Sequence, residues 1–146
     1  MSLSLSIEMR RYIKARIATE EGFRQFPYED TTGNLTIGFG RNLDTKGISH
    51  DEALKLLEND MLEAEREVWK SCPWYNALSE VRKIVILDMV FNLGIEKFSE
   101  FRGMIAAIQE GNFAEAAEHM RHSLWETQVG KRADRLADMM ETNELQ

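Results

Sequence analysis

The sequence predicts an α+β fold that is predominantly helical, with a small β-hairpin lobe near the N-terminus, a long helix, and a helical C-terminal lobe. Three observations predict it. Residues 23–40 combine strand-forming side chains with a central run of turn formers. Residues 49–71 carry the apolar pattern of one long helix, and the rest of the chain is divided by glycines and capping residues into short helical segments.

The first segment is a helix that ends at the first glycine. Apolar residues recur at helical spacing up to about Glu21, and Gly22 follows where a left-handed helix end is favoured. The apolar positions are Leu5, Met9, Tyr12, Ile13 and Ile17. We therefore predict a helix over 5–21, and we expect it to pack on the C-terminal lobe.

The next segment is a small hairpin. Its strand formers flank the turn residues 29–34, which include Asp30, Gly33 and Asn34. The strand formers are Phe26, Tyr28, Leu35, Thr36, Ile37 and Phe39.

A long helix follows the hairpin. Ser49 and Glu52 have the spacing of a capping box, in which the serine hydroxyl accepts from a backbone N–H while the glutamate reaches back. The pair Cys72-Pro73 stops the helix. Its length suits a connection between two lobes.

The capping residues and glycines after Pro73 predict that the rest of the chain is almost entirely helical. We predict helices over 79–93, closed by Gly94, and over 101–110, closed by Gly111, then one beginning at Asn112. Two shorter helices are expected over 123–128 and 131–140. The predicted organisation is a single domain, 1–146, with an N-terminal lobe over about 22–60 and a helical C-terminal lobe over about 73–146 that also includes helix 5–21.

Composition and charge restrict the class of protein. The 146 residues, 43% of them hydrophobic, suit one globular domain, and the single Cys72 is expected to be a small buried hydrophobe rather than a disulfide partner. A net charge of −7 argues against nucleic-acid binding, which needs a basic face. A negative net charge also provides no long-range electrostatic attraction to an acidic substrate, unless the binding cleft is locally basic. Residues 121–135 could supply such a patch or could be a solvated helix face.

No apolar run is long enough to span a membrane, and the N-terminus lacks the continuous apolar core and cleavage site of a signal peptide. We therefore expect neither stable membrane association nor export through a signal peptide. The histidines His50, His119 and His122 show no metal-ligand spacing with one another or with Cys72, so we expect no metal site and no cofactor.

Two carboxylates stand in different settings. Glu21 ends the first helix, where partial burial is expected, whereas Asp30 lies in an exposed turn, and such settings can separate two pKa values as acid–base chemistry requires. On the residues alone, the alternative is that both are among 25 mostly solvated Asp and Glu residues. Thr36 alone reads as an ordinary strand former.

A sequence resemblance decides between these interpretations. In the run 21–40, Gly22 follows Glu21, Asp30 stands nine positions after the glutamate, and Thr36 stands six after the aspartate and opens T-I-G-x-G. This pattern resembles glycoside hydrolase family 24, the phage-type lysozymes. The segment M-V-F-N-L-G at 89–94 and the pattern S-x-W-x-x-Q-x-x-x-R-A at 123–133 also resemble that family, so the likeness covers most of the chain.

The resemblance implies a lysozyme-like fold and roles for three residues. Glu21 would be the general acid, Asp30 would position water on the opposite side of the sugar, and Thr36 would help to hold that water. The outcome would be inversion, for which the two carboxyl groups should lie roughly 6.5–9.5 Å apart. Glu20 is the rival acid, but the family pattern selects the residue directly before Gly22.

Four further positions follow from the resemblance. Asn42, Phe91 and Asn92 stand where the family lines its saccharide groove, although by residue type alone Phe91 is a core aromatic and Asn92 a helix-end polar residue. Arg132 aligns with an arginine that pairs with the general acid. A nearby guanidinium lowers the pKa of a carboxyl group, whereas a general acid that works near neutral pH needs a raised pKa. Either burial of the acid outweighs the effect of Arg132 on its pKa, or the ion pair has a structural role only.

Arg41 departs from the family, which carries a histidine there in one well-known member. We expect this to remove a salt bridge and to change stability rather than activity.

The implied function is that of an endolysin acting on bacterial peptidoglycan. It would hydrolyse the β-1,4 bond between N-acetylmuramic acid and N-acetylglucosamine, as a monomer held in the host cytoplasm until lysis. Two alternatives remain. A wall-binding module without turnover would release no reducing ends, and a lytic transglycosylase would release 1,6-anhydromuramic acid.

Overall fold

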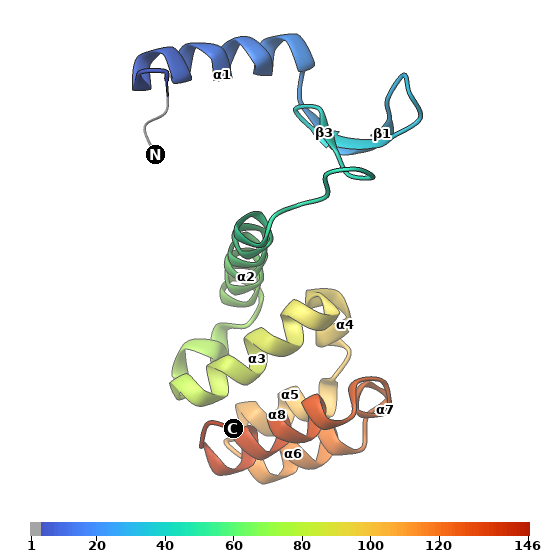
Figure 1. Cartoon of the computed structure of the whole chain (residues 1–146). Coiled ribbons are helices and arrows are strands. Elements are labelled where there is room, and N and C mark those ends of the chain that lie inside the picture. Colours follow the sequence, from blue (N-terminus) through green and yellow to red (C-terminus); the bar gives the residue numbers. More distant parts are fainter. Residues whose placement is uncertain (1–3) are drawn as a thin grey trace. The chain divides into compact units, whose positions relative to one another are not determined.

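The computed structural model describes residues 4–146, apart from the side chains of Leu124 and Thr127, and the chain forms two compact units (Figure 1). Unit 1 ends at Leu54 and unit 2 begins at Lys55. The α+β class and the helical majority predicted from the sequence are confirmed.

Unit 1 begins with α1 (Ile7–Glu21). Ser6 caps it by accepting a hydrogen bond from the Met9 N–H at 3.2 Å, and Gly22 ends it at φ 70°. The predicted helix is confirmed, with its start two residues later than expected. Within its own unit α1 buries none of its side chains. Its packing on the C-terminal lobe stays a prediction.

The hairpin is a three-stranded antiparallel sheet in the order β1 (Arg24–Glu29), β2 (Leu35–Gly38), β3 (Arg41–Asn42). Thr36 lies on the central strand, opposite Tyr28 on one side and Asn42 on the other. The register of β1 shifts between Arg24 and Tyr28, a stretch that holds a proline, which has no N–H for the ladder. The third strand was not predicted, because two residues are too short for a periodic signal.

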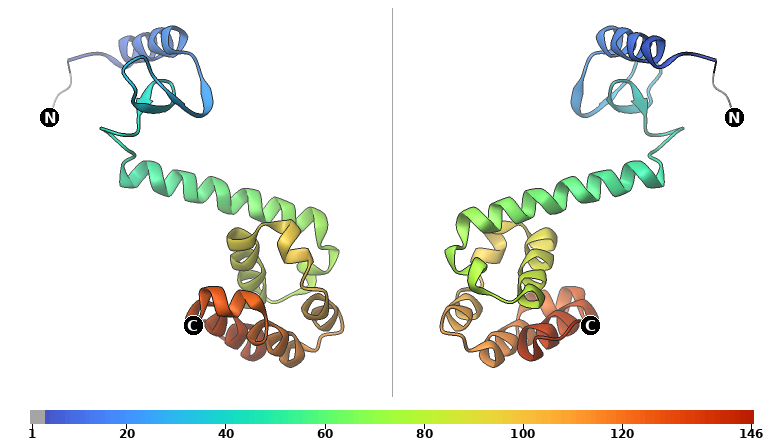
Figure 2. Two further views of the ribbon diagram at one scale, coloured as in Figure 1. Left: turned by 90° about the vertical axis from the view of Figure 1, so that its right-hand side faces the viewer. Right: turned by 90° about the vertical axis from the view of Figure 1, so that its left-hand side faces the viewer.

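The long helix is α2 (His50–Ser71), drawn without interruption in Figure 2. The predicted capping box is present: the Ser49 N–H donates to Glu52 Oε2 at 2.8 Å, and the Glu52 N–H donates to Ser49 Oγ at 3.1 Å. The helix stops at Ser71, before Cys72-Pro73, as predicted. Cys72 is 5% exposed, which confirms it as a buried hydrophobe, and burial raises the pKa of its thiol.

Unit 2 continues with short helices. These are η1 (Pro73–Ala77), α3 (Glu80–Leu93), α4 (Ile95–Ser99), α5 (Arg102–Gln109), α6 (Phe113–Arg121), α7 (Leu124–Val129) and α8 (Lys131–Thr142). Ser79, Asn112 and Ser123, the residues at which three helices were predicted to begin, are their N-caps and each accept a backbone N–H of the first helical turn. Neither η1 nor α4 was predicted, since one turn of helix has no measurable periodicity.

The core of unit 2 lies between these helices. In Figure 1, α6 lies beside α8 and α5, and α3 also packs on α8. Phe98 on α4 is fully buried, which explains why this single turn is ordered: its aromatic ring anchors it to the core. None of the helices within residues 4–146 is long and apolar enough to cross a membrane.

Candidate active site

The carboxyl group of Glu21 lies against the loop between β2 and β3. A Cβ built on Gly40 would come within 2.7 Å of Glu21 Oε2, so a larger residue here would require the Glu21 carboxyl group to move. Gly40 also has φ 76°, a conformation that other residues rarely adopt. The end of α1 and the T-I-G-x-G loop therefore meet at the candidate acid.

Asp30 is held by its own turn. Its Oδ1 accepts hydrogen bonds from the Thr32 N–H at 2.9 Å, the Thr32 hydroxyl at 2.8 Å and the Asn34 N–H at 2.9 Å. These donors, the Asn34 N–H first among them, lower the pKa of Asp30. Asp30 is thus an ionised carboxylate with one oxygen fully occupied by the protein and Oδ2 left for other partners.

Thr36 is linked to Asp30 through Asn34. The Asn34 carbonyl accepts from both the Asp30 N–H at 2.9 Å and the Thr36 hydroxyl at 3.0 Å. Thr36 is 3% exposed, and its hydroxyl oxygen keeps the capacity to accept a hydrogen bond. The turn thus fixes the two side chains relative to each other.

The settings of the two carboxyl groups differ within unit 1. Within unit 1 the Glu21 side chain is exposed, whereas Asp30 is half-buried. Unit 1 alone does not bury Glu21, since α1 buries none of its side chains there, so the partial burial of Glu21 stays a prediction. Asp30, expected in an exposed turn, is half-buried because its Oδ1 faces the N–H groups of its own turn.

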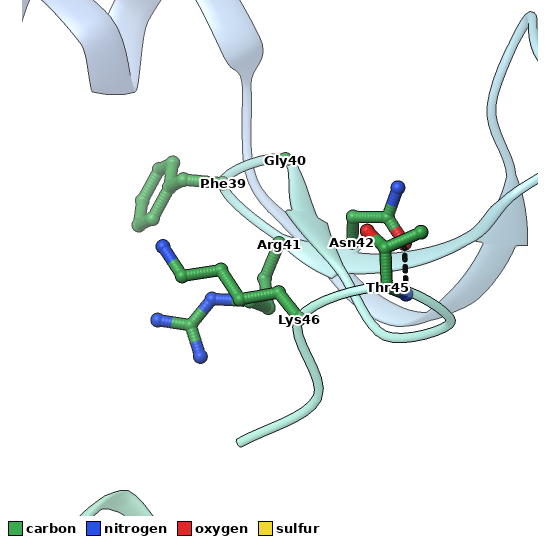
Figure 3. A pocket seen from close by; sticks show the side chains of 6 residues that line it. All are labelled: Phe39, Gly40, Arg41, Asn42, Thr45 and Lys46. Atoms are coloured by element: carbon green, nitrogen blue, oxygen red, sulfur yellow. Dashed lines mark hydrogen bonds between the residues drawn. The ribbon is translucent and has the colours of Figure 1, made fainter. Parts of the chain in front are cut away.

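Asn42 lines a hollow of about 480 Å³ beside Gly40 (Figure 3). The Asn42 Oδ1 accepts from the Thr45 N–H at 3.0 Å, the bond drawn in the figure, so the amide nitrogen is left to donate elsewhere. The other lining residues are Phe39, Arg41, Thr45 and Lys46.

Arg41 forms a salt bridge of its own. Its two Nη atoms bind Glu52 at 2.6 and 2.5 Å, and Nη1 also donates to the Gly47 carbonyl at 3.1 Å. This bidentate contact, with the Ser49 N–H next, lowers the pKa of Glu52 to about 2. The expectation that replacing histidine removes a salt bridge here was therefore wrong, because Arg41 reaches the glutamate of the capping box.

Unit 2 carries the other predicted residues. Phe91 is 41% exposed rather than a core aromatic, and Asn92 beside it is also exposed. The indole N–H of Trp125, whose side chain is only 2% exposed, donates to Asn92 Oδ1 at 2.8 Å. The Trp125 indole therefore fixes the Asn92 side chain through its oxygen and leaves the amide nitrogen available to donate.

Arg132 binds Asp88 through Nε at 2.8 Å and Nη2 at 2.5 Å. This partner was not predicted. The pairing of Arg132 with Glu21 stays a prediction. Of the two alternatives for residues 121–135, a basic patch is weakened by charge neutralisation, since Arg121 also binds carboxylates, those of Asp138 and Glu141.

Glu21, Asp30, Thr36 and Asn42 thus lie in unit 1, and the other three predicted residues lie in unit 2. The sequence reasoning missed the contacts of Gly40, Trp125 and Asp88. The first two lie inside the quoted motifs, so a search of the motifs for supporting residues could have found them. Asp88 carries no such signal.

A model of the family described as Phage lysozyme matches residues 18–140, a span that includes every predicted site residue. The chain belongs to the phage lysozyme family. It is accordingly a glycoside hydrolase, a lysozyme. Probable T4-type lysozyme 2 of Dictyostelium discoideum is 31% identical over 91% of this chain and 95% of its own length. Probable T4-type lysozyme 1 of the same organism is 30% identical with the same coverage.

The lysozyme is also similar to part of a larger phage protein. The pre-baseplate central spike protein Gp5 of Enterobacteria phage T4 is 26% identical over 87% of this chain but only 27% of its own length.

Proposed function

We propose that this lysozyme cleaves the β-1,4 bond between N-acetylmuramic acid and N-acetylglucosamine in bacterial peptidoglycan, with inversion. Glu21 is the general acid, and Asp30 is the base that positions the attacking water. The observation that carries this proposal is the contrast between the two carboxyl groups of unit 1: Asp30 is held ionised by three donors, whereas Glu21 accepts no hydrogen bond from residues 4–54.

In the first part of the step, the Glu21 carboxyl proton passes to the glycosidic oxygen as the bond breaks. Gly40 supports this role because its missing side chain lets the carboxyl group lie at the surface of the hairpin, where a sugar can reach it. The three heavy atoms nearest to a Cβ built on Gly40 all belong to Glu21, and none belongs to adjacent Glu20.

In the second part, Asp30 Oδ2 accepts a proton from a water molecule whose oxygen bonds to the anomeric carbon. The Thr36 hydroxyl oxygen is the proposed acceptor that orients this water. The link through the Asn34 carbonyl supports this role, because it holds the turn and the strand in one arrangement. Such fixed positioning is a large part of what an enzyme contributes.

Asn42, Phe91 and Asn92 are proposed to contact the glycan. Each amide has its oxygen occupied by a protein donor, which leaves the nitrogen to donate to a sugar oxygen. Phe91 offers an exposed ring face for the apolar side of a sugar.

The mechanism is tested by separate Glu21→Gln and Asp30→Asn substitutions, with Glu20→Gln and Glu29→Gln as matched controls. We expect each site variant to lose at least about a hundredfold in the release of reducing ends from purified peptidoglycan, while both controls keep the unmodified rate. NMR of fresh products should show the α-anomer first. Retention of the β-anomer would overturn inversion, and products lighter by one water would indicate a transglycosylase.

We also propose that the biological role is lysis of a bacterial host. Family membership supports it. Expression in the cytoplasm alone should leave a culture intact, whereas added permeabilisation of the inner membrane should clear it within minutes. A Glu21→Gln culture should not clear under either condition.

A further inference from the structure

The hollow lined by Gly40 lies next to Glu21, the proposed general acid. Gly40 lines the hollow, and a Cβ built on Gly40 would come within 2.7 Å of Glu21 Oε2. A volume of about 480 Å³ is in the range that holds a small ligand or a sugar substituent. A group bound here would belong to a glycan already positioned for cleavage.

Within the described residues, one of the two positive charges of the hollow has no carboxylate partner. Arg41 is neutralised by Glu52, but the exposed Lys46 ammonium has no carboxylate within 4.0 Å in the part of the chain that the structure describes. Figure 3 shows its side chain extended on the side of Phe39, next to the Arg41 guanidinium. The hollow thus carries a net positive charge in a protein whose total is −7.

Neutral donors line the rest of the hollow. The Asn42 amide nitrogen is left to donate because its oxygen is held by the Thr45 N–H, and the Thr45 hydroxyl lies beside it. Phe39 closes the other side with a ring that is 54% exposed and that packs 5.6 Å from Phe23, centroid to centroid. One ammonium, one amide donor and one aromatic wall match a sugar that bears a carboxylate.

We propose that this hollow binds a carboxylate of the peptidoglycan, with Lys46 as its ion-pair partner. This inference rests on the proposed function, which places a glycan against Gly40. The carboxylate has two sources, the lactyl group of a muramic acid without peptide or the stem peptide attached to it. The charge argument supports the inference: an acidic enzyme approaches an acidic polymer only where a local cation offsets the repulsion.

Binding is measured by NMR titration of the full chain carrying Glu21→Gln, which prevents turnover. Three tetrasaccharide probes are used: N-acetylglucosamine–N-acetylmuramic acid repeats with stem peptides, the same repeats without peptides, and neutral tetra-N-acetylglucosamine. Lys46→Glu reverses the charge, Lys46→Arg keeps it, and Arg10→Glu on exposed α1 makes the same charge change elsewhere in unit 1.

We expect Lys46→Glu to weaken binding of at least one acidic probe about three- to tenfold, since an exposed ion pair is replaced by repulsion. Lys46→Arg should restore the affinity, and neither Arg10→Glu nor the neutral probe should show the effect. Amide signals of residues 39–46 should move with the acidic probe. Loss with the peptide-bearing probe alone assigns the stem peptide, and loss with the peptide-free probe assigns the lactyl group.

The proposal is overturned if Lys46→Glu leaves both acidic probes unchanged, or if it weakens the neutral probe equally. The proposed function fails in a different way. If the unmodified lysozyme releases no reducing ends while the Lys46-dependent binding persists, the hydrolytic mechanism is wrong and the carboxylate site stands.

Discussion

Glu21 and Gly40 are 19 positions apart in the chain, yet a methyl group on Gly40 would come within 2.7 Å of the Glu21 carboxyl oxygen. The last glycine of the T-I-G-x-G segment therefore affects the position of the candidate acid as well as the turn, because a side chain there would displace the Glu21 carboxyl group. Its effect on activity can be separated from its effect on stability.

Gly40→Ala should lower kcat at least about tenfold, because the added methyl group displaces the Glu21 carboxyl group from its position. It should also cost about 1 kcal/mol of unfolding free energy for the positive φ. Gly111→Ala is the matched control, since Gly111 has φ 74° and nothing within 4 Å of its added Cβ. Urea unfolding should show similar losses, and only Gly40→Ala should affect turnover. An equal loss of kcat in both variants would refute the contact.

Thr32→Val should shift the acid limb of the activity profile toward higher pH. The Thr32 hydroxyl is one of the donors that hold the pKa of Asp30 below its usual value, so its removal raises that pKa. A base with a higher pKa is protonated, and activity lost, at a higher pH. Rates at neutral pH should stay near those of the unmodified protein. Thr32→Ser should restore the profile, and Thr31→Val should leave it unchanged.

Glu52→Gln should remove part of the acid dependence of stability. The native pKa of Glu52 is about 2, below its usual 4.5, so its contribution is complete above about pH 4.5 and is lost as the pH falls toward 2. The variant should have a lower free energy of unfolding at neutral pH than the unmodified protein. Its free energy of unfolding should also decrease less as the pH falls from about 4.5 toward 2. Urea unfolding between pH 2 and 7 measures this, with Glu58→Gln, in an exposed pair 3.5 Å from Lys55, as control. High salt should reduce the difference in stability between the unmodified protein and Glu52→Gln, because it screens the ion pair with Arg41.

Asn92→Ala should cost roughly 1–3 kcal/mol of unfolding free energy, because it leaves the buried Trp125 indole N–H without its acceptor. Adding Trp125→Phe should cost less in the Asn92→Ala background than in the unmodified protein. A double-mutant cycle from urea unfolding checks this. Additive losses would show that the hydrogen bond contributes nothing to stability.

Much of the fold could be predicted because its signals are local. Ser6, Ser79, Asn112 and Ser123 each cap a helix by accepting an N–H three residues ahead, so a short stretch of sequence holds the whole interaction. The capping box of α2 works in the same way. The segments η1 and α4 escaped prediction because packing of a few side chains, Phe98 above all, holds them in place.

The candidate site was predicted as a set of positions rather than as an arrangement. The motif 21–40 identified Glu21, Asp30 and Thr36 through their spacing. It did not show that Asp30 is enclosed by its own turn while Glu21 is exposed within unit 1, because burial depends on the course of the backbone around a residue.

The sequence by itself determined most of the helices, the hairpin, the family and two candidate carboxylates, since these depend on residues close in the chain or on motif spacing. Only the tertiary structure decided the partners across longer separations: Glu21 with Gly40, Arg41 with Glu52, Arg132 with Asp88, and Trp125 with Asn92. The reason is physical. A cap is complete within one helical turn, whereas a contact between distant residues forms only when the intervening chain has folded and brought their side chains within hydrogen-bond distance.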